Sequence, residues 1–505
     1  MRAGTPDTVD ALASRFARSL RAPAPPAAIA LVIGGALRFL FLGSRSLWFD
    51  EALTLLVASR PLSLTHSFLM RFEVSPPLYS VLMHAWIRLF ADPRIGLRVF
   101  SAACGIGALI AFRDLSRRLL PEGARLPALF LAAASSYWLH FAQDGRVYAL
   151  LTLIVVCEAR LTLELTERPT RRLWAAYAAV AALGLYAHYY FGLILAAHAA
   201  WLLRRWRRSP RELAALFAAH GCAAAAFLPW LGSLMTQFGM HRGDLAIGEP
   251  LGFRHLCGLI GTVFFDVTYL GLILPSWFVP AVGAGVLATC AAAGVRLARQ
   301  DGEAAERGAL DFLLWHAAAF VALVGAAEFV CGRPVTQARY FAPVAPFLYL
   351  LAALELSRGG RAAAAGRRAL GALVVAGTAG YFISGLVVDP RLGALAATVR
   401  GTDRRLPLVY LDTYYYLPMR NYYLLERPHF LVAEASEGVD YPGLPPYDGV
   451  LGPDLLRRLG PCVVLDEKRW LGGPALSIAD GAQVAALIAR SPLAAKRRPG
   501  PAEQR

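Results

Sequence analysis

Residues 369–388 read ALGALVVAGTAGYFISGLVV, a run of 20 residues without a charged side chain. A helix needs about 20 apolar residues to cross the roughly 30 Å hydrocarbon core of a bilayer, so this run predicts a membrane span. Two arginines, Arg367 and Arg368, directly precede it. Apolar blocks with arginine clusters beside them recur along the chain, and this pattern predicts the fold class.

The composition agrees with a membrane protein. Apolar residues make up 57% of the 505 residues and charged residues only 17%, whereas a soluble domain has about 25% charged residues. The formal charge of +16 comes from arginines in short clusters between apolar blocks. Membrane topology explains that charge better than a nucleic-acid partner does. We therefore predict a polytopic α-helical membrane protein with about eleven spans, at 27–43, 96–112, 126–142, 149–166, 173–187, 190–204, 212–232, 274–295, 311–330, 340–357 and 369–388.

The arginines also predict the orientation. With the N-terminus inside, six inner loops hold 23 arginines, and four charged outer segments hold 10 over a greater length. Because inner loops carry the excess of Lys and Arg, this orientation is favoured, and residues after 388 then lie outside.

The domain organisation follows from these spans. We expect a cytoplasmic segment at 1–26, a transmembrane domain at 27–388 with a large outer loop at 44–95, an extracytoplasmic domain at 389–490, and a disordered basic tail at 491–505. Strand-like runs at 406–412, 429–434 and 461–467 alternate with helical patterns at 414–425, 452–459 and 481–490, an alternation that indicates a small α/β unit.

The segment 76–90 of the outer loop could be mistaken for a span. Its polar residues Ser80, His84 and Arg88 recur every four positions and form one stripe on an apolar helix. Such a pattern favours a helix that lies in the membrane interface.

Carboxylates in the outer loop are the first candidates for chemistry. Asp50 and Glu51 stand in WFDEA; Asp50 could N-cap a helix at 51–59, with Glu51 in its first turn, or serve in catalysis. Glu73 stands in RFEVSPPLY, where the Pro-Pro step forces a turn. It is either a surface residue at a bend or a second carboxylate of the site.

Three later turns carry further candidates. Asp144 and Arg146 lie in AQDGRVYAL, where they could form a local turn pair or serve a site. His188 lies in LYAHYYFG and could bind a phosphate or a metal, or belong to an interfacial aromatic belt. Arg339 lies in RPVTQARYFAPVAP, as an interfacial anchor or as a fork for phosphate. The topology that the apolar blocks and the arginine distribution predict places all of these residues at the outer rim.

The ordered motifs resemble a known family. WFDEA, PPLY followed by an amphipathic helix and Arg98, QDGRVYAL, YAHYYFG and ARYFAPVAP arrive in the order of the membrane glycosyltransferases of the C-type fold. The chain is similar in particular to the branch of protein O-mannosyltransferases and the lipid A aminoarabinose transferase. The resemblance covers about residues 30–360.

The resemblance implies an activity, a location and partners. It implies transfer of a sugar from a polyprenyl-phosphate carrier to a lipid, glycan or protein acceptor, on the outer face of a bacterial cytoplasmic membrane. Membrane lipids would be further partners.

The resemblance also implies roles for residues. The family's essential acidic residue falls on Asp50 and its second acidic position on Asp144, and its arginine before the late span falls on Arg339. Glu73 and His188 lie near positions that approach a metal or the carrier phosphate in some relatives, which makes a divalent metal ion a candidate cofactor. Where many relatives have His or Asn before Pro-Pro, this chain has Ser75.

The residue types fit an inverting displacement. Asp50 would act as the base for the acceptor hydroxyl, and Arg339 with Arg146 would stabilise the leaving phosphate. Secondary candidates for the site are Glu51, Tyr340 and Arg98. Two other classes stay open at this point: a transporter or lipid flippase, and a non-catalytic envelope assembly protein.

Overall fold

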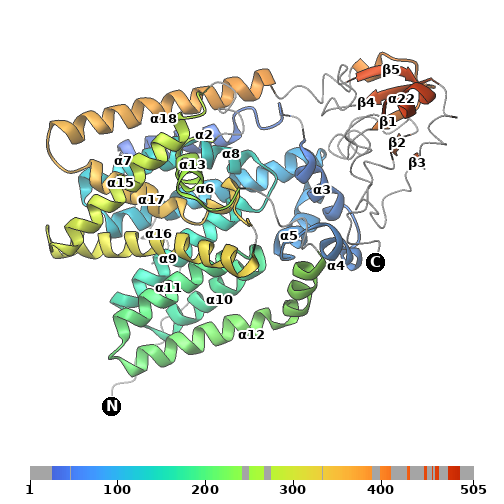
Figure 1. The fold of residues 1–505 in the computed structure, drawn as a ribbon. Helices are drawn as coiled ribbons and strands as arrows, with labels where there is room; N and C mark the ends of the chain where they lie inside the picture. The colour runs from blue at the N-terminus through green and yellow to red at the C-terminus, as the bar shows by residue number, and fades with distance from the viewer. Residues whose placement is uncertain are drawn as a thin grey trace. The chain divides into compact units, whose positions relative to one another are not determined.

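The computed structural model describes residues 25–45, 47–240, 249–266, 274–332, 334–388, 398–410, 429–432, 449–451, 458, 461–465 and 476–488. The chain divides into two compact units, and Figure 1 labels the helices and strands that they contain. The first combines Met1–Leu42 with Arg98–Phe382, and the second combines Gly43–Leu97 with Ile383–Arg505.

The first unit is built from helices. They are α2 (Pro25–Phe39), α6 (Pro93–Leu119), α7 (Glu122–Ala134), α8 (Ser136–Gln143), α9 (Tyr148–Glu167), α10 (Arg171–Ala187), α11 (Phe191–Trp206), α12 (Pro210–Met240), α13 (Phe253–Phe264), α15 (Phe278–Ala298), α16 (Ala304–Cys331), the 3-10 turn η2 (Ala338–Phe341), α17 (Ala345–Leu356) and α18 (Arg361–Val388).

Every predicted span coincides with a helix or a helix pair, as expected for a polytopic helical membrane protein. Within the described ranges, four helices are both long and apolar enough to cross a bilayer on length and composition alone. They are Pro93–Leu119, Pro210–Gly239, Phe278–Ala298 and Ala304–Cys331. The total of eleven spans stays a prediction.

Two of the predicted spans are interrupted. The span predicted at 126–142 is a pair, α7 and α8, separated by Ser135 in an extended conformation. The hydroxyl of Ser135 lies 2.6 Å from that of Tyr349, so a partner on another helix satisfies the polar group at the break. The span predicted at 340–357 begins instead as η2 and continues as α17.

Helix α17 lies inside the helical unit. Ten of its twelve residues, Ala345 to Leu354, are buried, and it packs on α7, α15 and α16. A helix that is apolar all round and buried all round forms the core of its bundle. Nearby, α13 packs on α15 with very close backbones, because a Cβ added at Gly283 would lie 1.8 Å from the carbonyl oxygen of Cys257. Small residues at such crossings let membrane helices approach.

The second unit contains a helical part within the outer loop. It comprises α3 (Phe49–Ala58), α4 (Leu62–Phe72), α5 (Leu78–Trp86) and the 3-10 turn η1 (Ile87–Leu89). With 9 residues, α5 is too short to span a membrane. Ser80 and His84 are buried, whereas Leu89 is 74% exposed. Arg88, the third residue of the predicted stripe, lies in η1 and is exposed. Only the Ser80 and His84 part of the stripe therefore faces protein, and the placement in the membrane interface stays a prediction.

The second unit also contains a five-stranded sheet. Its strands are β1 (Leu408–Tyr410), β2 (His429–Val432), β3 (Gly449–Leu451), β4 (Pro461–Leu465) and β5 (Leu476–Asp480), in the order β3-β2-β1-β4-β5. β4 and β5 pair antiparallel, and the other neighbours pair parallel. Strands β1, β2 and β4 and helix α22 (Gly481–Ile488) coincide with predicted elements. The helical pattern at 414–425 and nearly all of that at 452–459 lie outside the described residues.

Candidate functional site

The acidic pair opens helix α3. The helix begins at Phe49 and its N-cap residue is Trp48, so Asp50 and Glu51 both lie in the first turn. The alternative that Asp50 caps a helix beginning at 51 is therefore wrong. A carboxylate in the first turn is favoured by the positive end of the helix dipole. Asp50 is partly exposed, whereas Glu51 is only 1% exposed, so Asp50 is the more accessible of the two.

Glu73 ends helix α4. It is the C-cap residue, with an extended backbone, because the Pro-Pro step downstream cannot continue a helix. The hydroxyl of Ser75 donates a hydrogen bond to Oε2 of Glu73 at 2.8 Å. Ser75 thus gives the Glu73 carboxylate a fixed partner at the position where the family pattern has His or Asn.

The helices that carry Asp50 and Glu73 pack together around a small hydrophobic core. Ala52, Leu56 and Phe68 belong to a buried cluster that joins α3 to α4. His84 on α5 places its Nδ1 2.9 Å from the carbonyl oxygen of Ala58, the last residue of α3. The helices that carry Asp50 and Glu73 are therefore tied together within the outer loop.

In the first unit, the predicted residues of three separate turns come together. Asp144 is the C-cap residue of α8 and is 5% exposed. Its carbonyl accepts a hydrogen bond from the backbone N–H of Arg146 at 2.8 Å. The two residues thus share one tight turn between α8 and α9, as the Asp-Gly sequence predicts.

His188 stands at the centre of an aromatic group. Its ring centroid lies 5.7 Å from each of the rings of Tyr148, Tyr190 and Tyr340. Tyr190 stacks on Tyr340 at 4.6 Å. The guanidinium of Arg339 lies over the Tyr340 ring, 5.5 Å from its centroid, within cation–π range.

Hydrogen bonds fix the orientation of this group. The backbone N–H of Tyr190 donates to Nδ1 of His188 at 3.1 Å, so the neutral imidazole carries its proton on Nε2. The Tyr190 hydroxyl donates to the carbonyl of Val335. The hydroxyl of Tyr137 donates to the carbonyl of Ala338, at the start of η2, at 2.7 Å. The turn that carries Arg339 is thereby held in place.

The electrostatics of His188 reflect its cationic neighbours. Burial, followed by the positive charges of Arg339 and Arg146, lowers the pKa of His188 to about 3. Near neutral pH the group thus consists of two guanidinium ions beside a neutral imidazole that can donate from Nε2. Such a set favours a phosphate-like anion, whose charge the two arginines would balance.

The secondary candidates take different places. Tyr340 is part of the group around His188. Arg98 is 4% exposed and donates to the carbonyl of Leu42 at 3.1 Å, which makes it a support for the end of the first helical segment. Among the described residues, no group of three or more His, Cys, Asp or Glu side chains could hold a metal ion. Glu73 and His188 belong to different units, so a shared metal stays a prediction.

Two further carboxylates, Asp266 and Glu328, have partners that no local sequence pattern indicates. Oδ2 of Asp266 lies 3.3 Å from Nδ1 of His140 on α8. Glu328 accepts hydrogen bonds from the backbone N–H groups of Leu251 and Val335. These pairs join residues that are far apart in the sequence or lie across a turn, and no local pattern marks them.

Comparisons with known proteins support the membrane glycosyltransferase fold that the sequence motifs predict. Residues 74–232 match the family model described as dolichyl-phosphate-mannose-protein mannosyltransferase. The structure is similar to the crystal structure of ArnT from Cupriavidus metallidurans in the apo state, with a TM-score of 0.57, 14% identity, and coverage of 91% of this chain and 98% of that one. ArnT bound to undecaprenyl phosphate gives the same TM-score and coverages at 15% identity.

A further structure is less similar. The Archaeoglobus fulgidus oligosaccharyltransferase in complex with zinc and sulfate gives a TM-score of 0.47 at 16% identity, over 80% of this chain and 62% of that one. A comparison with curated protein sequences gives no match. The family match and the ArnT structures agree with the ordered motifs, and together they show that this chain has the fold of the C-type membrane glycosyltransferases.

Proposed function

We propose that the protein transfers a sugar from a polyprenyl-phosphate carrier to an acceptor hydroxyl at the outer face of a bacterial cytoplasmic membrane. The observation that carries this proposal is the group of Arg146, His188 and Arg339, which converges from three turns of the first, helical unit, called the membrane unit below. Its positive charge and its hydrogen-bond donor suit the phosphate of a lipid-linked sugar. The fold, shared with a protein solved with undecaprenyl phosphate, supports the same donor class.

The residues suggest how the transfer proceeds. The acceptor oxygen attacks the anomeric carbon while the bond from that carbon to the phosphate oxygen breaks. Asp50 takes the proton of the acceptor hydroxyl, and Asp144 is the second acidic residue of the site. Arg339 and Arg146 stabilise the charge that grows on the departing phosphate. Attack opposite the leaving group inverts the anomeric carbon.

The proposal assigns roles within each unit separately. In the outer loop it makes Asp50, in the first turn of α3, the base, and it retains Glu73 with its Ser75 partner as a further carboxylate. In the first unit it assigns the phosphate site to Arg146, His188 and Arg339. The acceptor is a lipid, a glycan or a protein, and the sheet region outside the membrane is the proposed place for its selection.

A transfer assay tests the proposal directly. The purified full-length protein would be incubated with labelled polyprenyl-phosphate sugars, and label that leaves the carrier for an acceptor fraction would be measured. We expect transfer with at least one donor and its loss in Asp50→Asn. Absence of transfer across hexose and pentose donors, with the protein folded and the carrier bound, would refute the enzymatic proposal.

One observation favours a second candidate, a lipid flippase or transporter. Glu158 lies within α9 with 0% exposure, and neither carboxylate oxygen has a hydrogen-bond partner within the described structure. Ionisable groups at such depth often mark a transport path. A flippase would move labelled carrier lipid across a proteoliposome without cleaving the sugar, whereas the enzyme would cleave it.

A further inference from the structure

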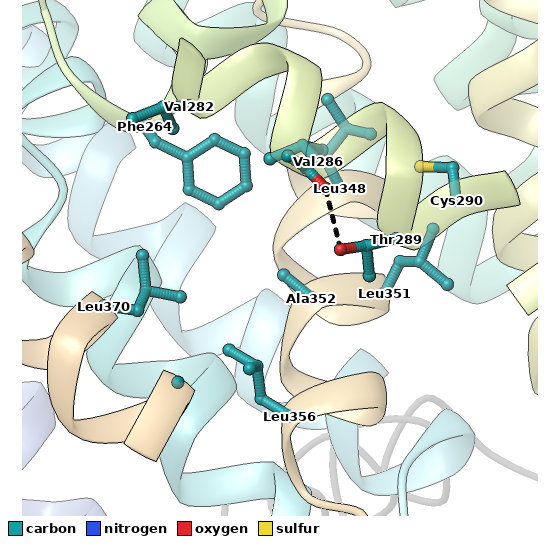
Figure 2. Close-up of a pocket in the computed structure, with 12 residues that line it drawn as sticks. Phe264, Val282, Val286, Thr289, Cys290, Leu348, Leu351, Ala352, Leu356 and Leu370 are labelled. Carbon is teal, nitrogen blue, oxygen red and sulfur yellow. Dashed lines mark hydrogen bonds between the residues drawn. The ribbon is translucent and has the colours of Figure 1, made fainter. Parts of the chain in front are cut away.

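An apolar pocket lies in the membrane unit between α13, α15, α17 and α18, with a volume of about 270 Å³ (Figure 2). Phe264 and Val282 line one end, and Leu356 and Leu370 line the other. The hydroxyl of Thr289 donates to the carbonyl of Gly285 in its own helix at 2.9 Å. The pocket therefore offers a ligand a mainly hydrocarbon lining.

The helices around the pocket also expose apolar side chains. Val295 on α15 is 50% exposed, and Val375 on α18 is 55% exposed. Only 17% of the most apolar 18-residue stretch of α15 is buried within the protein. In a membrane-spanning unit such surfaces face lipid. A hydrocarbon chain from that lipid is therefore better placed to fill the apolar pocket than water is.

The end of the pocket at Leu356 is basic. Nη1 of Arg367 donates to the carbonyl of Leu356, so this guanidinium is fixed beside a lining residue. Arg368 follows and is exposed. Arg367 directly follows Gly366, which also lines the pocket, and Arg368 lies two residues before the lining residue Leu370. The apolar pocket matches the acyl chain of a phospholipid, and the two arginines at its end match the phosphate of the headgroup.

Nearby acidic groups do not cancel this charge. Arg296 places Nη1 2.6 Å from Oε2 of Glu355, and Arg358 places Nη1 2.6 Å from Oε1 of Glu306. These two carboxylates are thus matched by two arginines. The charges of Arg367 and Arg368 remain in excess at this end.

We propose that an anionic phospholipid binds here, with an acyl chain between α15, α17 and α18 and its phosphate at Arg367 and Arg368. On the orientation that the arginine distribution predicts, this end of the pocket faces the cytoplasm. Basic pockets between helices on that side suit anionic headgroups. The site is separate from the outer phosphate site proposed for the sugar donor.

Native mass spectrometry of the full-length protein in neutral detergent tests this site. Phosphatidylglycerol and phosphatidylcholine with identical chains are the probes, and we expect retained adducts only with phosphatidylglycerol. The double variant Arg367→Gln/Arg368→Gln should bind it about twenty-five-fold more weakly, since each arginine near an anionic headgroup contributes roughly fivefold. Arg171→Gln/Arg172→Gln, a matched change in another predicted inner loop, should leave binding unchanged.

A pocket-filling variant separates chain binding from charge. A Cβ added at Gly285 meets no atom within 4 Å, and the same holds at Gly294 on the same helix. Gly285→Phe places a ring at the lining and should abolish the adduct, whereas Gly294→Phe, outside the lining, should retain it. Equal binding of both phospholipids, an adduct that survives Gly285→Phe, or its displacement by equimolar polyprenyl phosphate would each overturn the proposal.

Discussion

Acidification tests the electrostatics of the proposed phosphate site through His188. The pKa of this imidazole falls from 6.5 in an unfolded chain to about 3 in the fold. Below pH 6.5 the unfolded state therefore binds a proton that the folded state does not bind. Stability is then complete above about pH 6.5 and declines as the pH falls toward 3.

The magnitude follows from the two pKa values. Between pH 7 and pH 5 this one group should lower the free energy of unfolding by about 2 kcal/mol, since each pH unit inside the window contributes about 1.4 kcal/mol. The side chain is only 8% exposed, so solvent screens the effect little. In thermal terms this corresponds to a loss of roughly a few degrees in the unfolding midpoint.

The assay compares variants across pH. Thermal unfolding of the full-length protein in detergent would be followed at pH 7 and pH 5 for the unsubstituted chain, His188→Gln, and the control His66→Gln at an exposed position. The His188 variant should lose about 2 kcal/mol less than the other two on acidification. A polyprenyl phosphate should narrow this difference, because its anion favours the protonated imidazole. Identical pH sensitivity in all three proteins would refute the reasoning.

Three further predictions concern packing, donor binding and the outer loop. Gly283→Ala should prevent stable folding or lower the unfolding midpoint sharply in a fluorescence-detected melt, because its Cβ would lie 1.8 Å from a backbone oxygen, whereas Gly285→Ala on the same helix should be tolerated; equal melts would contradict the packing. Arg339→Gln should weaken polyprenyl-phosphate binding about tenfold to a hundredfold, measured by competition with labelled carrier, since a charge-assisted hydrogen bond contributes roughly 1.5–3 kcal/mol; unchanged binding would remove it from the site. Ser75→Ala should lower the transfer rate about tenfold or more by releasing the Glu73 carboxylate, since a hydrogen bond to a charged group contributes roughly 1.5–3 kcal/mol; a rate equal to that of Ser75→Thr, which keeps the hydroxyl, would show that this bond has no role in transfer.

Much of the helical unit could be predicted because its signals are local. Apolar blocks and arginine clusters mark where helices lie, and no distant residue is needed to recognise them. The break at Ser135 has no Pro or Gly signal, and the hydroxyl there meets that of Tyr349, 214 positions away. The pair of His140 and Asp266 likewise joins residues 126 positions apart in the sequence.

The candidate site likewise has some features that the local sequence predicts and others that only the packed helices produce. The turn at Asp144 could be predicted from its Asp-Gly sequence. The position of Asp50 was only partly predictable, because the helix begins before it, at Phe49, and leaves it in the first turn. The contacts of His188 with Tyr148 and Tyr340 require three turns to meet. Such convergence is a property of the packed bundle, and no single motif reports it.

The most direct measurement is the rate of sugar transfer by Asp50→Asn with a donor that the unsubstituted protein uses. The account predicts a loss of at least about a hundredfold, the scale of general base catalysis, with carrier binding and the unfolding midpoint unchanged. Asp92→Asn, the same change at a carboxylate of this outer loop that pairs with Arg94, should keep the transfer rate. Full transfer by Asp50→Asn would contradict the central claim that Asp50 is the base.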